Sequence, residues 1–171
     1  AIPKSQEEYR NSLFALKSKY KSSDTSAKQM KVIKEREAFD KKNDAMFMDS
    51  WVAKITNVYN SFIVCEYDGI EYNLNPIGYR DNTIYNKGQK IIFSGFVKHS
   101  DKRSIEFDDF SLSIDCISIM SLDSKNNLFK PKENEIKSLI TKVEKRIGKN
   151  SIWRVEDKNP LLKEMLSILN N

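Results

Sequence analysis

His99 is the only histidine of the 171-residue chain, so any mechanism that needs an imidazole base must use it. Its neighbours are Lys98, Ser100, Asp101 and Lys102, a polar setting typical of an exposed loop between strands. The sequence contains no G-x-S-x-G, H-E-x-x-H, P-loop or C-x-x-C motif. We therefore predict no nucleophile elbow and no phosphate cradle, and we interpret the chain as non-enzymatic.

Four carboxylates near the end of the predicted sheet are the best candidates for a hard cation, which takes oxygen ligands. They are Glu106, Asp108, Asp109 and Asp115. Their spacing matches no EF-hand loop, and strand alternation puts Asp108 and Asp109 on opposite faces. The sequence predicts no bound metal and no cofactor. A hydrolase that uses paired carboxylates remains an alternative, although it would need a cleft that the sequence does not indicate.

The only two cysteines, Cys65 and Cys116, both fall in predicted strands. An even number is compatible with one disulfide in an oxidising compartment, and two buried free thiols are the alternative, since free Cys packs as a small hydrophobe. The chain begins Ala1-Ile2-Pro3 without a methionine, which fits removal of a signal peptide, although a trimmed chain would look the same. We predict a periplasmic or secreted protein, with the cytoplasm as the alternative. No run of 18 apolar residues is present, so no membrane span is predicted.

The net charge of +5 suggests a nucleic-acid partner, but the charges are unevenly placed. Residues 1–50 hold 11 Lys and Arg against 8 Asp and Glu, residues 51–122 hold 7 against 9, and residues 123–171 hold 11 against 7. A groove that binds nucleic acid without sequence preference needs cations along the backbone path. The middle segment lacks this pattern, so nucleic acid is the less favoured partner.

The N-terminal residues predict a helical hairpin. Ser5 and Glu8 have the spacing of a capping box, and the apolar residues that follow lie on one helical face. A polar break at residues 22–26 then leads into a second helix over residues 26–43, whose surface is rich in Lys and Glu.

From Ser50 the apolar period changes from 3.6 to 2, which predicts strands. Asp68-Gly69 between two β-prone runs predicts a hairpin with a type I′ turn. Gly95 lies inside the most apolar strand, where a glycine usually marks a bulge or bend. The apolar alternation of the last long strand shifts phase near Cys116 and Ile117, which predicts a second bulge.

Five strands in about 72 residues, with a long connection before the fourth, favour an OB-type Greek-key barrel over a sandwich. We predict an α+β protein with an N-terminal helical hairpin (residues 1–49), a five-stranded barrel (residues 50–122) and two C-terminal helices (residues 123–171), together forming one compact unit. The first of these helices should begin near Pro131 and end at Gly148, and the second should span residues 159–169.

The segments WVAKITNV, CEYDGIEYNL, KGQKIIFSGFV and SLSIDCISI resemble the OB-like domains of uncharacterised bacterial exported proteins and lipoproteins. The resemblance covers residues 50–122. It implies the barrel and a bacterial envelope setting, and it carries no functional residues.

OB barrels commonly bind through the face of their second and third strands and through the loops after strands 1 and 4. We expect a protein or cell-envelope component to bind there, because tyrosine rings offer contact area at low entropy cost, although each of these tyrosines could instead be core. A single-stranded nucleic acid is the alternative partner, and monomer and homodimer both remain open. The expected binding residues are Tyr59, Phe62, Tyr67, Tyr72, Tyr79, Lys98, Lys102 and Arg103.

Overall fold

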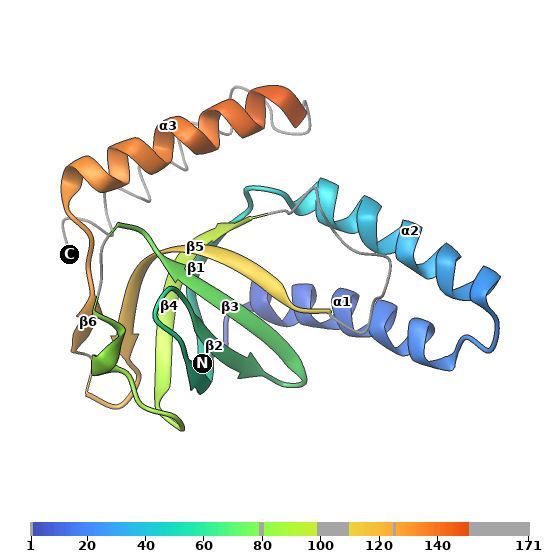
Figure 1. Ribbon diagram of the computed structural model, residues 1–171, viewed down its shortest axis with the longest axis horizontal. Helices are drawn as coiled ribbons and strands as arrows, with labels where there is room; N and C mark the ends of the chain where they lie inside the picture. Colours follow the sequence, from blue (N-terminus) through green and yellow to red (C-terminus); the bar gives the residue numbers. More distant parts are fainter. Residues whose placement is uncertain (1, 79–80, 99–109, 125, 151–171) are drawn as a thin grey trace.

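The computed structural model describes residues 2–78, 81–98, 110–124 and 126–150. Within these residues the protein is α+β, with a closed five-stranded β-barrel and three helices (Figure 1). The elements are α1 (Lys4–Ser22), α2 (Ser26–Asn43), β1 (Phe47–Val58), β2 (Ile63–Tyr67), β3 (Ile70–Pro76), the 3₁₀ turn η1 (Asn82–Ile84), β4 (Lys90–Val97), β5 (Leu112–Ser121), β6 (Asn127–Phe129) and α3 (Glu133–Asn150). The expected α+β barrel is confirmed at this level.

The sheet has the order β3-β2-β1-β4-β5-β6, and β3 also pairs with β5. The β3–β5 pairing is parallel, whereas the other pairings are antiparallel, and it closes the barrel. β5 pairs with β3 over residues 112–116 and with β6 near Ile119 and Met120. The short strand β6, which the sequence did not predict, therefore extends the sheet beyond the end of β3.

Local sequence accounts for two features of the barrel, the tight turn between β2 and β3 and the bulge in β5. Asp68 and Gly69 have φ values of 45° and 83°, so the predicted positive-φ hairpin between β2 and β3 is confirmed. Ser94 pairs with Ser118 while Gly95 pairs with Cys116, which leaves Ile117 as the extra residue of a bulge. A Cβ atom at Gly95 would collide with the backbone oxygen of Asp115, so this close approach requires glycine.

The bulge separates two apolar clusters. The main core fills the barrel, and its largest fully buried members include Trp51, Tyr72 and Phe93. A smaller cluster lies between the barrel and α3, which is drawn above the barrel in Figure 1. It consists of Ala45, Phe96, Ile117, Ile136 and Leu139. Cys116 belongs to the main core and Ile117 to the smaller cluster. The extra residue of the bulge therefore lets β5 place consecutive side chains in both clusters.

The N-terminal helices pack beside the barrel (Figure 1). Tyr9 and Leu13 of α1 enter the main core. On α2, Arg36 and Asp40 form an ion pair of 2.8 Å in which both side chains are almost fully buried. Arg36 also donates to the backbone oxygen of Ser111 over 2.9 Å, so this residue ties α2 to the segment that enters β5.

Three predictions about the helices need correction or fall outside the described residues. The capping box at Ser5 is wrong, because α1 begins at Lys4 and the Ser5 hydroxyl instead accepts from Trp51 Nε1 over 3.2 Å. Gly148 does not end α3, which continues to Asn150. The helix expected over residues 159–169 lies outside the described residues. Among the described helices, none is both long and apolar enough to cross a membrane.

Candidate binding site at the β1–β2 turn

The turn between β1 and β2 presents a stacked pair of aromatic rings. The backbone N–H of Tyr59 donates to Phe62 O over 2.9 Å and closes the turn. The two rings stack with their centroids 4.7 Å apart and an interplanar angle of 23°. Asn57 Nδ2 donates to the Tyr59 hydroxyl over 2.9 Å. Tyr59 nevertheless remains 47% exposed, so the pair offers an ordered aromatic surface to solvent.

A second segment, from Asp81 to Tyr85, lies against this turn. Asp81 caps η1: the Thr83 hydroxyl and backbone N–H donate to Asp81 Oδ1 over 2.6 and 3.0 Å. These two hydrogen bonds hold the pKa of the Asp81 carboxyl below its usual value. The local order of Asp81 and Thr83 thus comes from a side-chain cap that short polar residues form readily.

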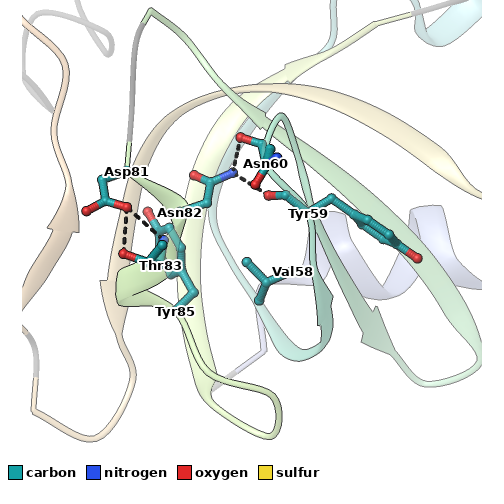
Figure 2. Close-up of a pocket in the computed structure, with 7 residues that line it drawn as sticks. All are labelled: Val58, Tyr59, Asn60, Asp81, Asn82, Thr83 and Tyr85. Atoms are coloured by element: carbon teal, nitrogen blue, oxygen red, sulfur yellow. Dashed lines mark hydrogen bonds between the residues drawn. The ribbon is translucent and has the colours of Figure 1, made fainter.

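Asn82 joins the two segments (Figure 2). Its Nδ2 donates to the backbone oxygens of Tyr59 and Asn60 over 2.9 and 3.1 Å. The side chain is 7% exposed, and its Oδ1 atom has no hydrogen-bond partner within the described part of the chain. Figure 2 shows this oxygen turned away from the two carbonyls, on the side of Asp81. A buried acceptor without a partner costs about 1–3 kcal/mol, which a bound donor would recover.

A pocket of about 480 Å³ lies between these two segments. Its volume is typical of small-molecule sites, which span about 300–1,000 Å³. Asp81 is the only charged residue among the described residues that line it. The described lining consists of Val58, Tyr59, Asn60, Asp81, Asn82, Thr83 and Tyr85.

Five of the eight residues expected to bind lie in the described part of the chain, and these five do not form one surface. Tyr59 and Phe62 lie together at the turn. Tyr67 lies at the opposite end of β2, half-buried against the core, where removal from water and the carboxylates of Glu7 and Asp68 raise its pKa.

Tyr72 is a core residue rather than a surface residue. Its ring is fully buried beside Trp51 and Phe93, its hydroxyl accepts from Gln6 Nε2 over 3.3 Å, and burial raises its pKa well above the usual range. Of the basic residues, Lys98 is exposed just beyond β4. Tyr79, Lys102 and Arg103 lie outside the described residues, as do His99, Glu106, Asp108 and Asp109.

The outer face of β2, β3 and β5 is polar and carries no cation of its own. These three strands contain no Lys or Arg, and Lys54 of β1 pairs directly with Glu66 of β2. Alternate burial along the strands turns outward the side chains of Glu66, Glu71, Asn73, Asn75, Ser113 and Asp115. The acidic character predicted for the barrel segment is therefore present on the outer face of these three strands.

Cys65 and Cys116 are two free thiols, both buried. Of the two alternatives that the sequence left open, this structure has the free thiols. Burial raises the pKa of Cys65, and the charges of Cys116 and Glu71 raise it further. Burial also raises the pKa of Cys116 to about 12, and the thiol donates to Ser118 O over 3.2 Å. A nucleophilic cysteine needs a lowered pKa and access to solvent, so neither thiol is suited to attack a substrate.

Sequence reasoning missed Asp81, Asn82 and Thr83, which it treated as part of a long connection. The available signal was the sequence Asp81-Asn82-Thr83 itself, since Asp followed two residues later by Thr is a common capping pattern. In the described residues, no group of three or more His, Cys, Asp or Glu side chains is placed to hold a metal ion. Comparison of the chain with protein-family models, with curated proteins and with solved structures gave no match.

Proposed function

We propose that the barrel is of the OB type, flanked by the N-terminal helical hairpin and by C-terminal helices. The circular order β1-β2-β3-β5-β4, with β3 parallel to β5, supports this assignment because an OB barrel is a five-stranded Greek-key barrel. The resemblance to OB-like domains of bacterial exported proteins remains part of the proposal. The free thiols add no support for an oxidising compartment, so the periplasmic or secreted location is proposed without them.

We infer that the protein is a non-catalytic binding protein that takes a protein or cell-envelope component at the β1–β2 turn. The observation that carries this inference is the exposed ring of Tyr59, which stacks on the half-buried Phe62 beside a pocket. Large exposed aromatic rings held in one conformation mark interaction sites, because they bury much area at little entropic cost. An OB barrel uses the loop after its first strand in binding, which is where this pair lies.

The two alternatives have weaker support. A single-stranded nucleic acid would need cations along its path, and β2, β3 and β5 contain none. A carboxylate-based hydrolase needs a general acid with a raised pKa beside a second carboxylate. The described lining of the pocket has one carboxylate, Asp81, and its pKa is lowered.

A three-part screen tests this function. Wild-type protein, Tyr59→Ala and the control Met30→Ala are probed against a phage-displayed peptide library, a glycan array and a labelled thymidine oligonucleotide at low and high salt. Met30 is an exposed apolar residue of α2, which makes it a matched control. We expect peptides or glycans that bind wild type and Met30→Ala but not Tyr59→Ala. The proposal fails if no ligand depends on Tyr59, and oligonucleotide binding with a steep salt dependence would replace it with the nucleic-acid alternative.

A further inference from the structure

We propose that the pocket between the β1–β2 turn and η1 binds a neutral oligosaccharide, with the orphaned Asn82 Oδ1 accepting from a sugar hydroxyl. The inference rests on the proposed binding function and specifies its ligand class. The described residues that line the pocket are residues 58–60 of the turn, and residues 81–83 and Tyr85 of the second segment (Figure 2).

The hydrogen-bonding groups of the pocket call for a ligand that donates. Asn82 Oδ1 has no partner in the described structure, whereas both donors of the same amide are engaged by Tyr59 O and Asn60 O. The amide cannot rotate to satisfy its oxygen, because rotation would aim that oxygen at two carbonyls. Because this oxygen is buried, binding requires η1 to shift enough to admit a hydroxyl from the Asp81 side, which would then meet this demand; hydroxyls also accept from neighbouring donors.

Charge disfavours the main alternatives. No described lining residue is cationic, so a phosphate or a carboxylate ligand would find no counter-charge among these residues and would face Asp81. An ammonium group would gain little, since Asp81 is exposed to water, where an ion pair is screened. In addition, Asp81 Oδ1 already accepts two hydrogen bonds from Thr83, so it is less available to a ligand. A neutral polyhydroxylated ligand matches this combination.

Apolar surface accompanies these polar groups. Val58 lines the pocket, and Ile84 of η1 is 47% exposed next to Thr83. Sugar rings carry C–H patches as well as hydroxyls, so they can cover a surface that is partly apolar and partly polar without leaving its polar atoms unpaired. Figure 2 shows the ring of Tyr59 extending away from η1. A second sugar unit that lies over the turn would meet this ring, which favours an oligosaccharide over a single sugar.

The test is an NMR titration of the full ¹⁵N-labelled chain with cellotetraose, N-acetylated chitotetraose and maltotetraose. We expect at least one of them to produce saturable shifts confined to amides in residues 57–62 and 81–85. Asn82→Ala should weaken binding about tenfold, the equivalent of one hydrogen bond. Tyr59→Ala should weaken binding by a similar factor. Because Tyr59 is exposed, this variant should fold, and it still tests the inference if the spectrum of Asn82→Ala shows an unfolded chain. Asp68→Asn, at the other end of β2, is the matched control and should bind like wild type.

The outcomes separate this inference from the proposed function. No shifts with any of the three sugars, shifts elsewhere on the molecule, or undiminished binding by both Asn82→Ala and Tyr59→Ala would overturn the inference. If the peptide library yields ligands that depend on Tyr59 while the sugars do not bind, the saccharide inference fails and the binding function stands. If neither peptides nor sugars bind, both fail.

Discussion

The two ends of β2 differ in how completely their polar and aromatic groups are used. At the β2–β3 hairpin, α1 covers the chain: Arg10 donates to Asp68 O over 2.9 Å and Lys17 donates to Gly69 O over 3.2 Å. At the β1–β2 turn the neighbouring segment is the short η1, Tyr59 is half-exposed, and Asn82 Oδ1 has no partner among the described residues. One end of the strand is thus closed by α1, and the other, which we call the open end, has the exposed ring and the unpartnered oxygen on which the proposed binding site rests.

Gln6 shows how thoroughly the closed end is satisfied. It is fully buried, its Nε2 donates to Val52 O over 2.7 Å, and its Oε1 accepts from Val52 N over 2.9 Å. The side-chain amide therefore pairs with β1 on the side where the pairing with β2 has ended, while Val52 pairs with Ile92 of β4. Gln6 and Asn82 are both buried amides that bind strand or turn backbone, but only Gln6 has both its oxygen and its nitrogen engaged.

Among the substitutions that remove a buried side-chain amide, the largest effect is expected for Gln6→Ala. The substitution leaves the N–H and C=O of Val52 and the Tyr72 hydroxyl without their partner, so we expect a loss of about 3 kcal/mol in the free energy of unfolding. Urea denaturation followed by circular dichroism measures it. Glu8→Ala on the same helix is the control and should cost less than about 0.5 kcal/mol, because its pair with Lys4 is exposed. Equal losses for the two variants would contradict the description of a closed end.

The contrast between the ends also marks what the sequence alone could predict. The Asp68-Gly69 hairpin, the helix over residues 26–43 and the bulge at Ile117 follow from local signals, namely turn chemistry, helix period and strand alternation. The role of Gln6 depends on a partner 46 residues away.

The candidate site was predicted only in part for the same reason. Tyr59 and Phe62 could be proposed as binding residues from their place after the first strand. Tyr72 has the same residue type as Tyr59 but is buried, and residue type alone does not distinguish the two. The pairing of Asn82 with the turn spans more than 20 residues and has no periodic pattern. Ser5 had the right spacing for a cap, but Trp51 Nε1 occupies its hydroxyl in the folded chain.

Alkaline pH should weaken the interior of the barrel. Because the pKa of Cys116 is raised to about 12, the folded protein keeps a proton that the unfolded thiol releases above pH ~8.5. Its stabilising contribution is complete below that pH and is lost as pH rises toward 12. Between pH 8 and 10 this thiol alone should account for about 2 kcal/mol of lost stability.

Urea titrations under reducing conditions, at several pH values, measure this loss. Cys116→Ala should have a lower starting stability but a flatter alkaline decline than wild type. Ellman's reagent gives an independent reading: neither thiol should react in the folded protein, and both should react in urea. An unchanged alkaline slope in the variant would contradict the assignment of this pH dependence to Cys116.

A smaller effect is expected for Asn82→Ala at the open end. The variant loses two hydrogen bonds to the turn but also removes the buried oxygen that had no partner, so the two effects partly cancel. We expect a loss of about 1 kcal/mol, with faster amide exchange at the β1–β2 turn. Hydrogen exchange measured by NMR locates the change, and Asn86→Ala in the exposed turn before β4 serves as the control. A loss as large as that of Gln6→Ala would mean that both ends are equally important for stability.

The smallest effect on stability belongs to Tyr59→Ala. Its ring is half-exposed and stacks on Phe62, so we expect a loss of about 0.5 kcal/mol. Tyr72→Ala removes a fully buried ring and should cost about 4 kcal/mol. Urea denaturation of both variants, alongside the ligand screen, compares two tyrosines of the same barrel. If Tyr59 is held for binding, its replacement removes ligand binding with little loss of stability. A stability loss close to that of Tyr72→Ala would instead make the stacked pair part of the core, and the open end would then be as structural as the closed one.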